Sequence, residues 1–328
     1  MTDPLTHLCT ELFAGLPRRD QRRRGAEYVA GLLRTPGRKS IRNIAGGAGE
    51  QRLHHFVSDS TWDWRPVRAA LRRHLLGVEP PDAWVVRSMF IPKAGAHSVG
   101  VARRFCHTRG AAVNAQHAVG VWAATAGWAA PVGWRLHLAA TPPAGCLAEA
   151  YLEQAAAGDR RPVVLDARGC DAAALIGRLR AGGAAVLARV DPDTPVWTNA
   201  RPPGHGDGPL PASRLIRMDP HIRRPLFGGG FAAARPARVA GRADDLTLLR
   251  LEDAVWLTDL AGRGPAELAR LAALPARVDE DLAAIGDRVG LRDYTGRSFA
   301  GWHRHVTLAS AAHAVLVLEG VDRRADAA

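Results

Sequence analysis

The first 78 residues alternate between short amphipathic segments and turns that contain glycine or proline. Apolar residues recur at helical spacing, as Tyr28, Leu32 and Leu33 do. The segments ELFAGL, RRRGAEYVAGLLR, IRNIAGGAG and QRLHHFVSD therefore predict several short helices. The stretch TPGRKS predicts a basic turn, and AGGAG predicts a turn between helices rather than a phosphate-binding loop.

From residue 83 the pattern changes to apolar, valine-rich segments. AWVVRSMFI, HSVGVARRFCH, VNAQHAVGVWAAT and WRLHLA predict an antiparallel meander, followed by a helix in LAEAYLEQAAAG. RPVVLDA, DAAALIGRLRAG and AAVLARV then predict a strand, a helix and a strand. Because a crossover through a helix joins parallel strands, we expect these two strands to pair in parallel.

The remainder of the chain predicts a loop, an inserted group of strands and the C-terminal helices. Residues 191–213 are rich in Pro, Gly and Asp and predict a long loop. ARVAG, DLTLLRLE and AVWLTDL predict strands, and PAELARLAAL, DEDLAAIGDRVGL and GWHRHVTLASAAHAVLVLEG predict three helices. We expect a helical domain over 1–78 and an α/β core over 79–328, with a loop and strand insertion at about 191–262.

Charge adds a candidate partner to this picture. The 328 residues carry 44 Lys or Arg against 32 Asp or Glu, a net charge of +12, which favours a polyanion such as nucleic acid. The stretch 18–73 holds 14 basic and 5 acidic residues, although a run such as RRDQRRR is also typical of a solvated helix start. The candidate DNA-binding residues are Arg18, Arg19, Arg22, Arg23, Arg24, Arg38, Lys39 and Arg42.

Several classes of protein are excluded by what the sequence lacks. The four cysteines form no CxxC pair, so neither a zinc site nor a disulfide framework is indicated. The first residues show no signal peptide, and no uncharged apolar run reaches the roughly 18 residues of a membrane span. We expect a cytoplasmic protein without a membrane partner.

Generic catalytic motifs are also lacking, and few residues stand out individually. The sequence has no GxxxxGK[ST] loop, no strand-linked GxGxxG, no HExxH and no GxSxG. Asp166 ends an apolar strand, a position where ligands bind in α/β folds but where helix caps also occur. Asp279 and Glu280 are predicted to begin a helix. His303 and His305 lie two residues apart on a predicted helix, so they point to different faces and do not form a metal pair.

Four blocks together resemble the DDE-type transposases of bacterial insertion sequences: the basic helical start, SVGVARRF, VVLDARG and GLRDYTGRSFAGWHRHVTLASAAHAVL. More narrowly, the chain resembles the DDE-superfamily endonuclease branch with a GRSxxGWHRH tail. The resemblance implies a ribonuclease-H-like mixed sheet flanked by helices, with a strand-rich insertion. It also implies three carboxylates that hold two Mg²⁺ or Mn²⁺ ions for cleavage and transfer of double-stranded DNA.

The resemblance maps only part of the catalytic triad onto this chain. Its first acid should lie eight residues before the glycine of a lysine-glycine turn, and counting back from Gly95 gives Arg87. Asp82 does not substitute, because five residues of extended strand place it about 16 Å away on the opposite face. The second acid maps to Asp166, and the third, normally a glutamate, maps to Asp279.

The accessory residues of the family are replaced as well. Where the family has a tyrosine, an arginine and a lysine that contact DNA phosphates, this chain has Ala272, Pro275 and Gly286. We therefore expect a DNA-binding protein of transposase origin that has lost cleavage, bound to the nucleoid and compatible with a homodimer. An active transposase, with metal held by Asp166 and Asp279, and a protein-interaction role without DNA are the alternatives.

The replacement of an acid by an arginine suggests a further hypothesis. Two carboxylates without a cation repel each other, and a guanidinium can bond a carboxylate through two hydrogen bonds. Arg87 would then balance the charge of Asp166 and Asp279 that metal ions balance in active relatives. The alternative is that the Arg87 side chain points into solvent.

Overall fold

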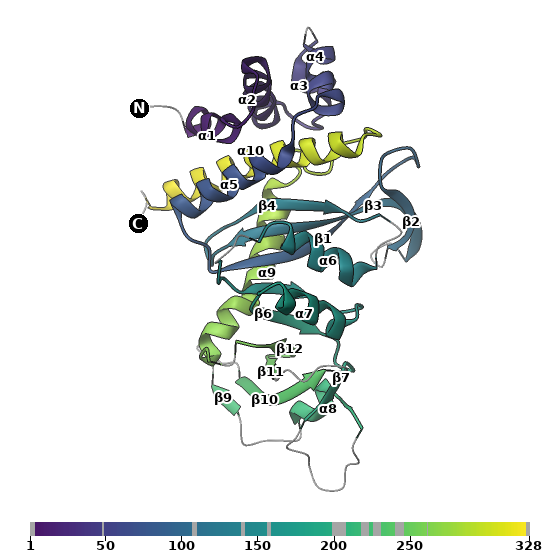
Figure 1. Ribbon diagram of the computed structural model, residues 1–328, viewed down its shortest axis with the longest axis vertical. Helices are drawn as coiled ribbons and strands as arrows, with labels where there is room; N and C mark the ends of the chain where they lie inside the picture. The colour runs from purple at the N-terminus through teal and green to yellow at the C-terminus, as the bar shows by residue number, and fades with distance from the viewer. Residues whose placement is uncertain are drawn as a thin grey trace. The chain divides into compact units, whose positions relative to one another are not determined.

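The computed structural model describes residues 4–47, 49–106, 110–138, 142–155, 159–198, 208–217, 223–225, 231–239, 246–260 and 262–325. The chain divides into two compact units (Figure 1). The first unit comprises Met1–Pro81, Ser88–Thr141 and Ala276–Ala328. The second comprises Asp82–Arg87 and Pro142–Pro275.

Short helices open the first unit, as the apolar spacing predicted. They are α1 (Pro4–Phe13), α2 (Arg19–Arg34), α3 (Ile41–Ala45), α4 (Glu50–His54), a π-helical turn η1 (His55–Asp59) and α5 (Trp64–Val78). Side chains cap two of them: the Ser40 hydroxyl accepts a hydrogen bond from the Asn43 N–H, and the Asp63 carboxylate accepts one from the Arg65 N–H. Gly46, with φ of 60°, ends α3 and confirms the turn predicted in AGGAG.

The strands of the first unit form an antiparallel group. β2 (Val101–Cys106) pairs with β3 (Ala111–Ala124), and β3 pairs with β4 (Ala129–Leu136). The sequence predicted this meander but placed the start of the last strand at residue 134, five residues too late. Alanines and a proline open β4 and give a weak strand signal, so only the partner strand reveals it.

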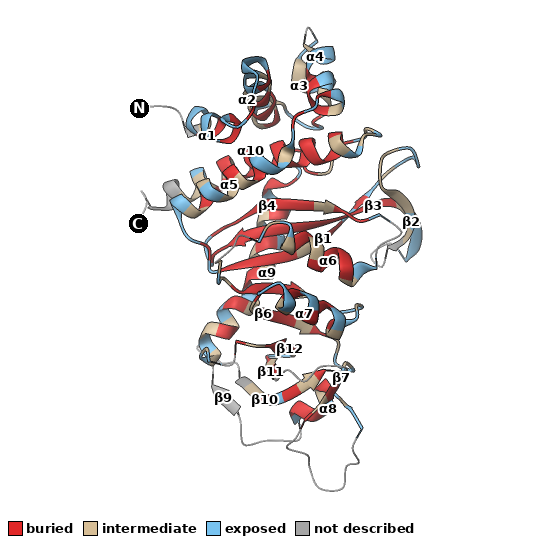
Figure 2. Ribbon diagram, viewed as in Figure 1, coloured by how far each residue is buried: buried red, intermediate tan, exposed pale blue. Residues whose placement is uncertain are grey.

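The C-terminal helix α10 (Phe299–Ala325) is the centre of the first unit. Figure 1 shows it between β4 and the helices of residues 4–54, and it packs on β4, α2, α5 and η1. Every residue from 301 to 315 is buried, which Figure 2 shows as continuous red. A helix that is buried on all sides, with polar residues such as His303 and Arg304 among its apolar ones, lies in such a site between two layers.

The second unit has a mixed sheet flanked by helices. β1 (Ala83–Pro92), β5 (Val163–Asp166) and β6 (Val186–Val190) run parallel; α6 (Pro143–Leu152) precedes β5, and α7 (Ala172–Ala181) connects β5 to β6. This confirms the parallel pairing and the predicted fold class. The Asp171 carboxylate caps α7 by accepting a hydrogen bond from the Ala174 N–H.

An antiparallel group continues this sheet from β6. Its strands follow the order β12 (Ala254–Thr258), β11 (Leu246–Leu251), β10 (Phe231–Val239), β7 (Pro195–Trp197) and β8 (Leu210–Pro211), with β9 (Arg223–Pro225) on β10 and the helix α8 (Ala212–Arg217) beside them. The predicted strand insertion is therefore present. The prediction of an unbroken loop over 191–213 is wrong, because β7, β8 and the start of α8 lie within it, and 199–207 lie outside the described residues.

A single helix, α9 (Pro265–Ile285), replaces the two helices predicted before residue 292. Pro275 lies inside α9, where it removes one backbone hydrogen bond and disfavours the helix. Apolar residues nevertheless continue at helical spacing through it, and Leu271, Leu274, Val278 and Leu282 are all buried. Burial of this stripe offsets the cost of the proline, which local sequence signals do not report.

The packing of the N-terminal helices and the character of the longer helices bear on the predicted domains and on the predicted absence of a membrane span. Within the first unit, α2 and α5 pack on α10, and α5 also packs on β4. Among the described helices, none has both the length and the apolar character needed to cross a bilayer.

Candidate functional site

The carboxylate of Asp166, at the end of β5, is held by an arginine. Arg168 donates from Nε to Asp166 Oδ1 at 2.9 Å and from Nη2 to Oδ2 at 2.6 Å. The Arg168 backbone N–H also donates to Oδ1, at 3.1 Å. Both carboxylate oxygens are thus bonded within the chain, in the two-point geometry that guanidinium groups favour.

Other arginines lie on the strands beside Asp166. Asp166 pairs in register with Arg189 of β6. On the other side, Val86 pairs with Leu165, so the next position of this register sets Arg87 beside Asp166. Partial burial alone would raise the pKa of Asp166, but the hydrogen bonds and charge of Arg168, together with the charge of Arg189, lower it overall.

Acidic residues gather beyond the same strand ends. Asp191 Oδ2 accepts a hydrogen bond from the Gly169 N–H at 2.7 Å, and Gly169 has φ of 68°. A cavity of about 270 Å³ lies here, lined by Cys170, Asp171, Ala172, Ala173, Asp191, Asp193, Thr194, Pro195 and Val239. Burial and the neighbouring aspartates raise the pKa of the Cys170 thiol, so this cysteine is a poor nucleophile.

These residues do not fit a two-metal centre. Across the part of the chain that the structure describes, no three His, Cys, Asp or Glu side chains are arranged to hold a metal ion. Asp166 already has Arg168 on both oxygens. A guanidinium at this position repels a divalent cation and competes with it for the carboxylate oxygens.

Asp279, the other acid that the resemblance assigned, belongs to the first unit. It is exposed and lies well inside α9, so the prediction that Asp279 and Glu280 begin a helix is wrong. Arg277 pairs with Glu280 at 2.9 Å and with Asp281 at 2.8 Å. Asp281 also accepts a hydrogen bond from the Ala129 N–H. This part of α9 therefore has a structural role in its own unit.

The candidate DNA-binding arginines of α2 divide into two kinds. Arg22 donates from Nε to the Leu16 carbonyl at 2.7 Å, and Arg24 pairs with Glu27 at 2.8 Å with little of its side chain exposed. These two arginines hold the local structure together. Arg19 is exposed and Arg23 is 67% exposed, with only a 3.5 Å contact to Glu27. Arg19 and Arg23 are accordingly presented to solvent, as is Arg18 at the helix start.

The basic residues of the turn after α2 also fall into two kinds, exposed and buried. Arg38 and Arg42 are exposed, whereas Lys39 is only 4% exposed. Its backbone N–H donates to Asp293 Oδ2 at 2.7 Å, and its ammonium donates to the Thr35 carbonyl. Lys39 therefore stabilises the turn, and its charge is directed inward rather than toward a ligand.

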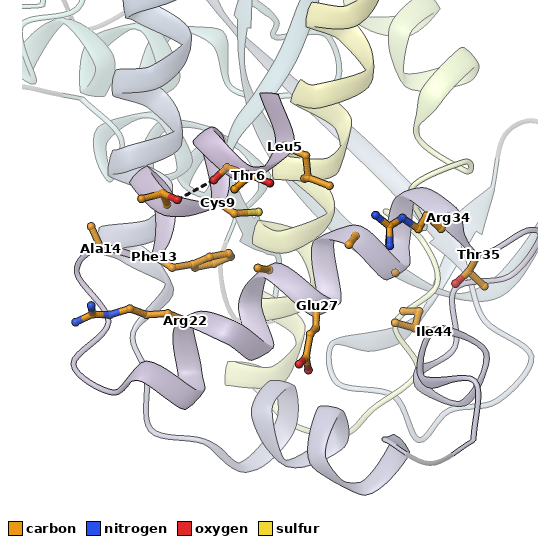
Figure 3. A pocket seen from close by; sticks show the side chains of 14 residues that line it. Leu5, Thr6, Cys9, Phe13, Ala14, Arg22, Glu27, Arg34, Thr35 and Ile44 are labelled. Carbon is orange, nitrogen blue, oxygen red and sulfur yellow. Dashed lines mark hydrogen bonds between the residues drawn. The ribbon is translucent and has the colours of Figure 1, made fainter. Parts of the chain in front are cut away.

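An apolar groove lies between α1 and α2 (Figure 3). It has a volume of about 870 Å³, with Cys9, Phe13 and Ile44 among its walls and Arg22, Glu27 and Arg34 among the few charged side chains. The helices pack closely at its floor because α2 carries glycines there. A Cβ on Gly25 would lie 2.7 Å from the Phe13 ring, and one on Gly31 would lie 2.4 Å from Ile44.

Sequence reasoning missed the buried network around the C-terminal motif. Arg68, on the same stripe of α5 as Leu71 and Leu75, donates to Thr307 Oγ1 and to the Trp134 carbonyl, each at 2.8 Å. It also lies 3.0 Å from His303 Nδ1. The sequence signal that could have identified this network is an arginine, Arg68, on the apolar stripe of α5.

The histidines of the motif point to different sides of α10, as predicted. His303 stacks on Trp64, with ring centroids 4.7 Å apart. His305 donates from Nε2 to the Gly290 carbonyl and accepts from the Tyr28 hydroxyl at Nδ1. The GWHRH block thus supplies polar core contacts, and its two histidines do not form a shared metal site.

Comparison with known proteins adds the following. Residues 11–143, about two fifths of the chain, match the DDE superfamily endonuclease family. No functionally curated protein matches the chain. A solved piggyBac transposase synaptic complex with hairpin DNA aligns with 99% of this chain and 74% of that chain, at 10% identity and a TM-score of 0.42. Over residues 11–143, the chain is thus similar to the DDE superfamily endonucleases.

Proposed function

We propose that this protein is a transposase-like DNA-binding protein of insertion-sequence origin that no longer cleaves DNA. The observation that carries the proposal is the two-point bond between Arg168 and Asp166. This bond occupies the carboxylate of Asp166, the one acid of the expected triad that the sequence retains unchanged. The family match supports the transposase origin and spans Arg87, the position of the first acid, but neither Asp166 nor Asp279.

The arginines beside Asp166 support the loss of cleavage further. The strand register sets Arg87 and Arg189 on either side of Asp166. Residues in register on neighbouring strands share one face of the sheet, so all three side chains belong to one face. The charge of Arg189 helps to lower the pKa of Asp166, and a contribution of Arg87 to the same charge balance is part of the proposal.

Binding to double-stranded DNA is proposed through the first unit. The exposed arginines of α2 and of the turn that follows it are the candidate contacts: Arg18, Arg19, Arg23, Arg38 and Arg42. Arginine donates to phosphate in a planar fork, which suits the backbone of a duplex. Lys39, Arg22 and Arg24 are left out of this set, because they are bonded within the chain.

The test is the salt dependence of duplex binding for the full chain and for Arg19→Ala/Arg23→Ala. Each neutralised phosphate contributes about −0.9 to the slope of log K against log salt. Loss of two contacts should reduce the slope by about 1.8 and weaken binding. A slope that this variant leaves unchanged would mean that the arginines only solvate α2.

A further inference from the structure

The loop between α9 and α10 is held by hydrogen bonds from a partly buried lysine. The loop spans residues 286–298 and carries the TGRS part of the motif. Lys93, which follows β1, donates from Nζ to the carbonyls of Arg292 and Tyr294, at 2.8 and 2.7 Å. Two bonds from one ammonium fix the middle of the loop against the lysine-glycine turn.

The start of the same loop is tied to α2 and to the basic turn. Asp293 accepts the backbone N–H of Lys39 at 2.7 Å. The Gly290 carbonyl accepts from His305, which in turn is bonded to Tyr28 of α2. The basic turn, the lysine-glycine turn and the loop are therefore one bonded assembly, although more than 190 residues separate Lys93 from its loop partners.

This assembly has a strong excess of positive charge. Its three segments, 34–42, 92–99 and 286–298, contain eight Lys or Arg and two Asp. Both acids are used internally: Asp287 pairs with Arg292 at 2.6 Å, and the other holds the basic turn.

Three arginines of the assembly present this charge to solvent. Arg38, Arg288 and Arg297 are exposed, and within the described ranges no carboxylate lies in salt-bridge distance of their guanidinium groups. Burial lowers the pKa of Lys93 to about 8, and the nearby charge of Arg38 adds to this. Burial also lowers the pKa of Lys39, and Arg288 adds to that. Arg38 therefore lies near Lys93, and Arg288 lies near Lys39.

We propose that Arg38, Arg288 and Arg297 form a second phosphate-binding surface, which holds the sugar-phosphate backbone of double-stranded DNA apart from the arginines of α2. A solvated face needs no fixed geometry, whereas the backbone of this one is anchored by hydrogen bonds from three parts of the chain. A backbone held in this way presents the guanidinium groups to phosphate without rearrangement of the loop. The inference rests on the DNA-binding function proposed above.

The experiment uses the full chain and a fluorescent duplex DNA oligonucleotide, with anisotropy measured over a salt series. Arg288→Ala/Arg297→Ala is compared with Arg160→Ala/Arg270→Ala, which removes two exposed arginines of the second unit that make no bond in the described structure. We expect the loop variant to weaken binding about tenfold and to reduce the salt slope by about 1.8. We expect the matched control to retain both values.

The outcomes separate this inference from the proposed function. If the loop variant binds as the matched control does while Arg19→Ala/Arg23→Ala loses affinity, DNA binding stands and the second surface is refuted. If the unmodified chain shows no salt-dependent binding to duplex DNA, the proposed function fails and the inference fails with it. Tighter binding to a duplex RNA of the same sequence would refute the assignment to DNA. A melting temperature equal to that of the unmodified chain confirms that the variants are folded.

Discussion

Arg168 and Asp166 form an ion pair with two hydrogen bonds at the carboxyl end of β5, the shorter of them 2.6 Å long. The two residues are only two positions apart in the chain. Their ion pair therefore depends on the local turn after β5 and on no distant element. It neutralises the carboxylate locally. The carboxylate therefore needs no metal ion to balance its charge.

Removal of Arg168 should raise the pKa of Asp166. In Arg168→Ala the burial of the carboxyl is no longer opposed by the guanidinium, so the pKa should move above its present lowered position. Carbon NMR titration of the labelled aspartate measures this. Arg160→Ala removes an equal charge from the same unit and should leave the pKa of Asp166 unchanged. Because Arg168 is 44% exposed, the loss of stability should remain below about 1 kcal/mol.

Two helical glycines should respond in opposite ways to alanine. Gly25→Ala would drive a Cβ to within 2.7 Å of the Phe13 ring, which should destabilise the protein by about 1–3 kcal/mol despite the better helix propensity. Gly77→Ala, near the end of α5, meets nothing within 4 Å and should stabilise by up to about 1 kcal/mol. Denaturant unfolding compares the two variants. Equal effects would show that α1 does not pack closely on α2.

Arg68 should be essential for stability rather than for DNA binding. It is 3% exposed and donates to Thr307 and to the Trp134 carbonyl. Arg68→Met keeps much of the apolar stem but leaves these acceptors buried and unsatisfied, so we expect a loss of about 3 kcal/mol. Arg73→Met, on the exposed side of the same helix, should change stability by less than about 0.5 kcal/mol. A mild effect at Arg68 would contradict its role in the core.

Four buried histidines should make the protein sensitive to mild acid. Burial lowers the pKa of His117, His305 and His313 to about 4 and that of His303 to about 2. The unfolded chain binds protons below about pH 6.5 while the folded chain does not, so stability is complete above that pH and falls as the pH drops toward 4. Each histidine contributes at most about 1.4 kcal/mol per pH unit.

Denaturant unfolding between pH 7.5 and 4.5 measures this loss, and His305→Gln should reduce the slope by about one proton. A slope that His305→Gln does not alter would show that this histidine is not held neutral in the core.

The strands and the fold class could be predicted because their signals are local. The apolar runs that became β1, β5 and β6 are bounded by polar turns, and the parallel pairing follows from the helix between β5 and β6. The turn at Gly46 was predictable for the same reason. The continuity of α9 through Pro275 was not, because it depends on burial of a stripe that only the folded chain supplies.

The candidate site could be predicted less well than the fold. The place of Asp166 at a strand end was evident from the chain, whereas its partner Arg168 was not identified as a charge-balancing residue. The inward direction of Lys39 depends on Asp293, which is 254 residues away along the chain. Composition also could not separate the bonded Arg22 and Arg24 from the exposed Arg19 and Arg23, because burial and pairing are set by the neighbouring helices.

The central claim is that DNA is bound and not cut, and a single assay on supercoiled plasmid tests it. The purified chain is incubated with plasmid and Mg²⁺ or Mn²⁺, and nicking and retardation are measured in the same samples, beside Asp166→Ala. We predict salt-dependent retardation with no nicking above background in either protein. Reproducible nicking by the unmodified chain that disappears in Asp166→Ala would contradict the account.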